Sequence, residues 1–75
     1  MSGVLGHICS ALNAPGASMN TRLRDLGVDE LGRADLALML EGRLGVELTD
    51  SDIELFNTVG DVRRACERAL GRAVA

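Results

Sequence analysis

Apolar residues recur at every third or fourth position in three separate segments of this chain. This spacing places them along one side of an α-helix, whereas a half-buried strand would need strict alternation. Leu and Ala supply 21 residues, against 11 for Val, Ile and Thr, and this balance also favours helices over sheets. The pattern therefore predicts an all-α fold, a small bundle of three main helices and one short helix.

The predicted elements fill most of the 75 residues as a single domain, residues 1–75. We expect main helices over about residues 2–13, 30–44 and 59–71, a short helix over about 50–55, and a long loop over 14–29. A domain of this size buries only about 60% of its unfolded-chain surface, so its core is thin. A deep catalytic cleft is not expected, and we predict that the chain is not an enzyme.

Capping residues set the expected helix ends. Ser2 and Thr58 are suitable N-caps for the first and last helices, and Thr49 or Asp50 opens the short one. Asn13 should stop the first helix, and Gly45 should end the second. A loop as long as residues 14–29 needs apolar anchors, and it offers three, Leu23, Leu26 and Val28.

Several classes of function are disfavoured by composition. Phe56 is the only aromatic residue, Lys is absent and the net charge is −3, which opposes nucleic-acid binding by stacking or by phosphate contacts. Cys9, Cys66 and His7 have no metal-ligand spacing, so no metal site is expected and the thiols should be buried and reduced. Residues 22–54 are acidic overall, which indicates either a solvated face or a partner with a basic surface.

Targeting signals are not evident. Residues 1–21 contain no Lys or Arg and are interrupted by Gly, Asn and Pro, unlike a signal peptide. No segment approaches the roughly 20 apolar residues of a membrane span. We therefore expect a cytoplasmic protein without membrane insertion, whose oligomeric state the sequence does not indicate.

One segment, residues 25–31, reads Asp-Leu-Gly-Val-Asp-Glu-Leu. It resembles the D-L-G-x-D-S-L signature of acyl carrier proteins, in which the serine opens the second helix and receives the phosphopantetheine arm. The likeness continues without a gap to Ala69 through the leucine spacing of the second helix, residues 45–48 after it, and Thr58-Val59-Gly60-Asp61-Val62. The resemblance implies the carrier fold and a context of fatty-acid, polyketide or related biosynthesis.

Glu30 stands where that family has its serine. A carboxylate has no hydroxyl from which to form the phosphodiester, so we expect no phosphopantetheine cofactor unless it is attached at an unusual site. Three interpretations of Glu30 stay open: loss of the carrier task, mimicry of the phosphodiester's negative charge, and covalent attachment through the carboxylate as an amide or ester. A deliberate replacement of the serine in a working carrier is a fourth.

The resemblance also implies docking to carrier-dependent enzymes such as synthases or acyl and aminoacyl transferases. Opposite charges set specificity and encounter rate in such contacts. The alternatives are a genuine carrier whose serine was replaced or whose attachment lies elsewhere, and an interaction module unrelated to acyl metabolism. Six residues form the predicted docking surface: Asp29, Glu30, Leu31, Arg33, Asp35 and Glu41.

Overall fold

The computed structural model describes residues 3–74, and the side chains of residues 3–72. Within that range the chain is all-α, as predicted, and its only strand-like feature is an isolated bridge between Arg22 and Thr58. The elements in order are helix α1 (Val4–Ala11), 3₁₀ helix η1 (Leu23–Leu26), helix α2 (Glu30–Leu44), short helix α3 (Asp50–Glu54) and helix α4 (Val59–Val74).

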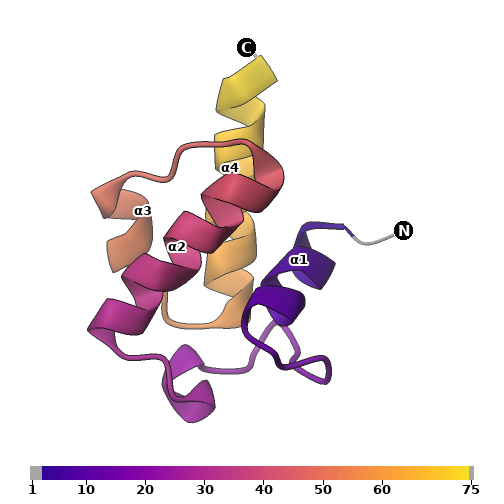
Figure 1. Cartoon of the computed structure of the whole chain (residues 1–75), viewed down its shortest axis with the longest axis vertical. Helices are drawn as coiled ribbons and strands as arrows, with labels where there is room; N and C mark the ends of the chain where they lie inside the picture. The colour runs from indigo at the N-terminus through magenta and orange to yellow at the C-terminus, as the bar shows by residue number, and fades with distance from the viewer. Residues whose placement is uncertain (1–2, 75) are drawn as a thin grey trace.

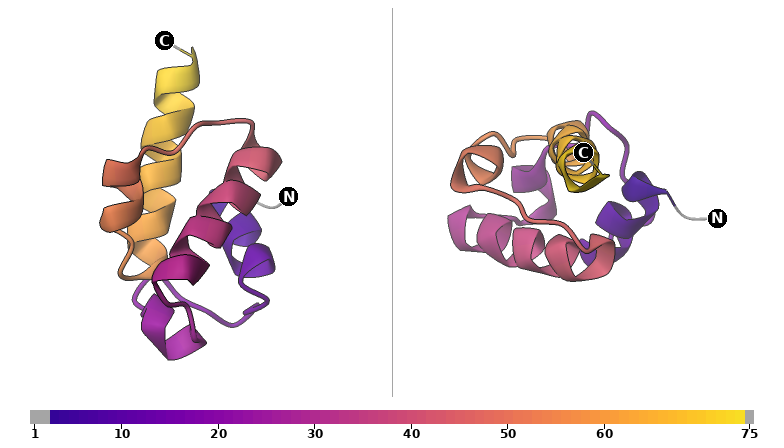
Figure 2. Two further views of the ribbon diagram at one scale, coloured as in Figure 1. Left: turned by 60° about the vertical axis from the view of Figure 1, so that its left-hand side comes forward. Right: turned by 90° about the horizontal axis from the view of Figure 1, so that it is seen from above.

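The three main helices enclose one core (Figures 1 and 2). Helix α1 packs against both α4 and α2, and α3 lies beside α2 on the side away from α1. The start of α2 and the 3₁₀ helix η1 lie together at the bottom of Figure 1, at the opposite end of the molecule from the last turns of α4. This arrangement leaves the N-terminal end of α2 at one pole of the bundle.

Helix α1 is shorter than the predicted range of 2–13. It begins after Gly3, whose backbone is extended and which provides no side-chain cap, while the predicted cap Ser2 lies outside the described residues. It ends because Asn13 adopts a left-handed conformation with φ +54°. The Asn13 and Ala14 amides then donate to the carbonyls of Ser10 and Cys9, which satisfies the last turn.

Helix α2 has the predicted bounds, and its leucines divide between two sides. Leu36 and Leu40 are buried with Ala37, whereas Leu31 and Leu38 are exposed. All four leucines belong to the apolar spacing of this helix. A helix of about 3.6 residues per turn, however, cannot bury positions 31, 36, 38 and 40 against a single neighbour. Only part of the apolar surface of α2 therefore belongs to the core.

Every element packs into the core, α3 only through the partly buried Ile53. Helix α4 contributes the largest share, and the chain between α2 and α4 adds a few more side chains. The buried apolar residues are Ile8, Cys9, Leu23, Leu36, Ala37, Leu40, Val46, Leu48, Phe56, Val59, Val62, Ala65, Cys66 and Ala69.

The long loop between α1 and α2 is anchored as predicted. Leu23 is buried, and Leu26 and Val28 pack against the core. The prediction missed the 3₁₀ helix η1 within this loop, since four residues are too few to show a helical period. Backbone hydrogen bonds fix the loop to the start of α4: the Leu23 amide donates to the Asn57 carbonyl (2.8 Å), and the Gly60 amide to the Met19 carbonyl (2.9 Å).

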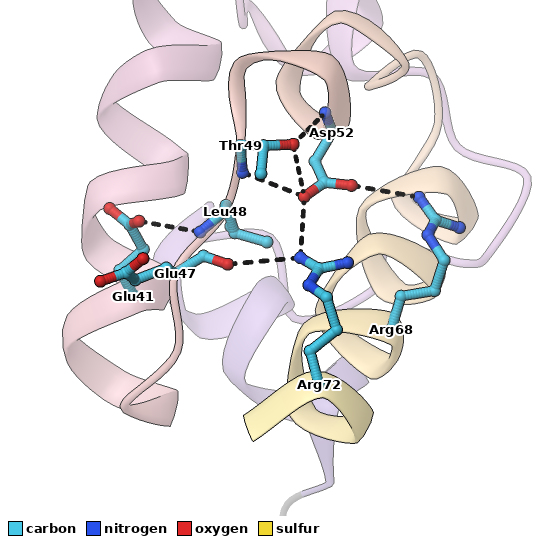
Figure 3. A network of polar contacts seen from close by, with 7 residues as sticks. All are labelled: Glu41, Glu47, Leu48, Thr49, Asp52, Arg68 and Arg72. Carbon is cyan, nitrogen blue, oxygen red and sulfur yellow. Dashed lines mark hydrogen bonds and ion pairs between the residues drawn. The ribbon is translucent and has the colours of Figure 1, made fainter. Parts of the chain in front are cut away.

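Asp52 joins α3 to α4 (Figure 3). Its carboxylate accepts hydrogen bonds from the backbone amide and hydroxyl of Thr49, both at 3.0 Å, and the Thr49 hydroxyl accepts from the Asp52 amide. Two arginines of α4 also reach it, Arg72 at 3.1 Å and Arg68 at 3.5 Å. The hydrogen bond from the Thr49 backbone amide is the main cause that holds the pKa of Asp52 below its usual value, and the Thr49 hydroxyl and Arg72 lower it further. Burial of the carboxylate opposes this shift.

The two cysteines are buried free thiols, as predicted. Cys66 lies in the core, where burial, with smaller contributions from Asp52 and Glu67, raises its pKa to about 11. The thiol of Cys66 is therefore protonated and unreactive at neutral pH.

None of the helices within residues 3–74 has both the length and the apolar character that a membrane span requires.

Candidate functional site

The start of α2 is set up by a sharp turn after η1. Gly27 has φ +78°, a left-handed conformation that costs little only for glycine. The amide of Val28 donates to the Leu23 carbonyl (3.0 Å), which closes the turn. The Asp-Leu-Gly part of the sequence motif thus redirects the chain into α2.

Asp29 is the N-cap of α2. Its carboxylate accepts a hydrogen bond from the Gly32 amide at 2.7 Å, which satisfies one of the unpaired amides of the first turn. Gly32 fits closely here: a Cβ at this position would lie 3.1 Å from Val28 Cγ1 and 3.2 Å from Asp29 Oδ1. Asp29 therefore has a structural task, although it stays exposed to solvent.

Glu30 is the first residue of α2 and is exposed. Within residues 3–74 its carboxylate has no hydrogen bond or ion pair to another side chain. A negative charge at this position is stabilised by the positive end of the helix dipole. The carboxylate is thus presented at the pole of the bundle with its oxygens available to solvent or to a partner.

An exposed apolar stripe runs along α2 from Glu30. Leu31 is 77% exposed and Leu38 is 67% exposed, and the exposed Ala34 lies between them. These three residues, spaced by three and four, lie on one side of the helix and are called the apolar stripe below. Leu55, 58% exposed, follows α3. Leucines this exposed bury little apolar surface when the chain folds, so a cluster of them indicates a surface for another molecule.

The predicted docking residues do not all lie on this surface. Asp35 is exposed on α2. Arg33 is half-buried and donates to the Phe56 carbonyl (3.4 Å), which links α2 to the end of α3. Glu41 is also half-buried, and its carboxylate accepts from the Leu48 amide (2.9 Å), so it holds the connection after α2 (Figure 3). Glu41 is thus engaged within the molecule.

A cavity of about 420 Å³ lies next to Glu30. It is bounded by η1 and the first turn of α2, which follow each other closely in the chain, and by the turn between α3 and α4, which is distant in sequence. Its lining combines three arginines, two carboxylates and apolar side chains, and the prediction from sequence did not include it. The lining residues are Arg22, Leu23, Arg24, Val28, Asp29, Glu30, Arg33, Phe56, Asn57 and Thr58.

The apolar stripe was also missed, although a signal for it was present. Leu31, Ala34 and Leu38 repeat at helical spacing, but so do Leu36, Leu40 and Leu44, and spacing alone does not show which set the core buries. A single helix that carries two apolar sets can bury only one of them against a small bundle.

Comparison with known proteins agrees with this geometry. Residues 2–72 match the protein family described as "Phosphopantetheine attachment site". The chain belongs to this family. It is 43% identical to the acyl carrier protein of Thermotoga maritima over 47 residues, which cover 63% of this chain and 58% of the relative. It is 46% identical to the acyl carrier protein of Clostridium perfringens over 43 residues, 57% of each chain.

The matched region spans a little more than half of each of these two acyl carrier proteins. The membership rests mainly on the family match, which covers almost the whole chain.

Proposed function

We propose that this phosphopantetheine-attachment family member works without a phosphopantetheine arm at the start of α2, as a docking module for carrier-dependent enzymes rather than as an enzyme. The observation that carries the proposal is Glu30, an exposed first residue of α2 at the place where the resemblance to acyl carrier proteins puts the modified serine. Synthases and acyl or aminoacyl transferases of fatty-acid or polyketide-type biosynthesis are the proposed partners.

The chemistry of attachment supports this view of Glu30. Phosphopantetheinylation joins a hydroxyl oxygen to phosphorus, and the carboxylate of Glu30 has no hydroxyl proton to lose. A phosphodiester at that position carries one negative charge, and so does the glutamate. Glu30 thereby keeps the charge of a loaded carrier at the head of α2 without the arm.

Four of the other hydroxyl groups do not offer an equivalent position. Thr49 and Thr58 cap α3 and α4 through hydrogen bonds to the amides of Asp52 and Asp61. Ser18 and Thr21 bond to each other in the loop. Neither pair lies at the start of α2, which favours an unmodified chain over attachment elsewhere.

The surface beside Glu30 has the composition of a docking site. The apolar stripe supplies area to bury, while Asp29, Glu30 and Asp35 add negative charge around it. Apolar contacts at the centre and charges at the rim are typical of protein interfaces. We propose a partner with an apolar groove flanked by basic residues, which the acidic rim would steer into contact.

The test is to replace Glu30 by serine and offer the variant to a broad-range phosphopantetheinyl transferase with coenzyme A. We expect Glu30→Ser to gain the mass of one phosphopantetheine, because the change completes the D-L-G-x-D-S-L signature at residues 25–31. Glu30→Gln is the matched control and should gain no mass. Circular dichroism on each variant checks that it is folded.

A folded Glu30→Ser protein that stays unmodified would contradict the descent from a carrier surface and favour an interaction module outside acyl metabolism. Modification of the unchanged chain by the same enzyme would contradict the proposal directly. Fragment sequencing would then identify the residue that carries the arm.

A further inference from the structure

Seven of the eight arginines fall into two groups with different partners, and the eighth, Arg43, donates to the Ser10 hydroxyl (3.4 Å). All four arginine side chains on α4 form ion pairs: Arg63 with Glu67, Arg64 with Asp61, and Arg68 and Arg72 with Asp52. Around the cavity beside Glu30 the situation is the reverse. None of its three arginines forms an ion pair within residues 3–74.

Of the three arginines, Arg33 gives the strongest indication of an anionic ligand. It is half-buried, yet its bond to protein is to a neutral group, the Phe56 carbonyl at 3.4 Å. A guanidinium keeps its charge at any physiological pH and has five N–H donors, so most of its donors stay free for a ligand. A partly desolvated cation without a counter-ion is costly, and a bound anion offsets that cost.

Arg22 and Arg24 line the same cavity from the η1 side and are exposed. Two carboxylates also line it, but Asp29 is already bonded to the Gly32 amide, and Glu30 is exposed. The three cations thus exceed the two anions. The surplus favours an anionic ligand over a cation or a neutral molecule.

The size and lining of the cavity restrict the ligand further. A volume of about 420 Å³ is within the usual range for small organic ligands, roughly 300–1,000 Å³, and is far more than a bare anion needs. Leu23, Val28 and Phe56 supply apolar lining. A phosphoryl group offers three acceptor oxygens and up to two charges, and it can therefore bond several guanidiniums at once, whereas a carboxylate has two oxygens and one charge.

We propose that the cavity between η1, the start of α2 and the α3–α4 turn binds a small phosphate ester non-covalently, with the phosphate held by Arg22, Arg24 and Arg33. Its organic part lies against the apolar lining. This inference is independent of the proposed docking function, since it uses the cavity and not the apolar stripe. It gives the chain a ligand that needs no covalent attachment.

The test is a titration of the isotopically labelled full chain, followed by NMR of backbone amides at constant ionic strength. Three probes separate the sources of affinity: phenyl phosphate, inorganic phosphate and benzoate. We expect saturable shifts at Leu23, Val28 and Thr58, with phenyl phosphate binding tightest because only it has both the phosphoryl and the apolar group.

Variants assign the binding to the arginines. Arg24→Gln, which removes a side chain without a hydrogen bond to the rest of the described chain, should weaken phenyl phosphate binding about tenfold, the loss of one charged hydrogen bond. Arg33→Gln should weaken it at least as much. Arg43→Gln, remote from the cavity at the other end of α2, is the control and should leave it unchanged. Glu30→Gln should strengthen it roughly two- to fivefold because a repelling charge is removed.

Several results would overturn the proposal. They are the absence of saturable shifts with phenyl phosphate, equal weakening by Arg43→Gln and Arg24→Gln, and binding of benzoate as tight as that of phenyl phosphate. Equal affinity for inorganic phosphate and phenyl phosphate would also contradict it, because the apolar lining would then contribute nothing. None of these outcomes bears on docking through the apolar stripe.

Discussion

Two acidic residues in the first turns of helices, Asp52 in α3 and Glu30 in α2, have opposite surroundings. Asp52 is buried at 6% exposure, accepts hydrogen bonds from Thr49 and Arg72, and forms an ion pair with Arg68 (Figure 3). Glu30 is exposed, and within the described residues no side chain pairs with it. Protein atoms therefore surround the carboxylate of Asp52, whereas solvent surrounds that of Glu30.

The contrast separates what holds the fold from what is available to a partner. The polar groups around Asp52 are paired with one another, so removing one of them should lower the free energy of unfolding. The exposed leucines of α2, Leu31 and Leu38, contribute little to the fold, because they remain in contact with water. The proposed docking surface is thus the part of α2 that folding leaves exposed to solvent.

The largest expected effect compares a buried with an exposed leucine of α2. Leu40→Ala should lower the free energy of unfolding by about 2–5 kcal/mol, because Leu40 is fully buried and its removal leaves a cavity. Leu38→Ala, at a 67% exposed position, should change it by less than about 0.5 kcal/mol. Urea denaturation of both variants measures the difference, and equal losses would contradict the division of α2 into two sides.

The next effect compares the two carboxylates directly. Asp52→Asn should cost about 2–3 kcal/mol of unfolding free energy, since it removes charged hydrogen bonds to Thr49 and leaves two half-exposed arginines unpaired. Glu30→Gln should cost less than about 1 kcal/mol, the value of its interaction with the helix dipole. Chemical denaturation at neutral pH distinguishes them, and a larger loss for Glu30→Gln would refute the comparison.

A smaller effect compares two glycines. A Cβ on Gly60 would lie 2.9 Å from the Met19 carbonyl oxygen, so Gly60→Ala must displace the loop that leads to the start of α2. We expect a loss of about 1–3 kcal/mol. Gly42 faces open space, and Gly42→Ala should instead stabilise the chain by up to about 1 kcal/mol through helix propensity. Thermal unfolding of the two variants should move in opposite directions.

The smallest effect is a pH dependence. The pKa of Asp52 lies below its ordinary value of 3.8, chiefly because of the hydrogen bond from the Thr49 amide. Its contribution to stability is therefore complete above about pH 3.8 and is lost as the pH falls through the folded-state pKa. The stability difference between the unchanged chain and Asp52→Asn should shrink below that pH. A difference that stays constant from pH 7 to strong acid would mean that Asp52 does not titrate in this way.

Much of the fold could be predicted from the sequence because helix ends carry local signals. Gly45 and Thr49 cap their helices where expected, and α2 has the predicted bounds. The α1 range was too long, since apolar spacing continues to Leu12 while the backbone turns at Asn13. Local spacing indicates a helical side but not the turn that ends it.

The site was less accessible to prediction, because its features depend on tertiary packing. Glu30 stood out through the motif alone, but the cavity beside it combines η1, α2 and the α3–α4 turn, which only the fold brings together. Glu41 was predicted to face a partner, and the structure shows its carboxylate bonded to the Leu48 amide. Charge in a sequence does not reveal which carboxylates the fold itself uses.

The absence of a phosphopantetheine arm is tested most directly by the intact mass of this chain isolated from its own host. We expect the mass of the bare polypeptide, because Glu30 offers no hydroxyl for a phosphodiester. An added phosphopantetheine on the isolated chain would contradict this expectation and would show that the family's arm is carried at another residue.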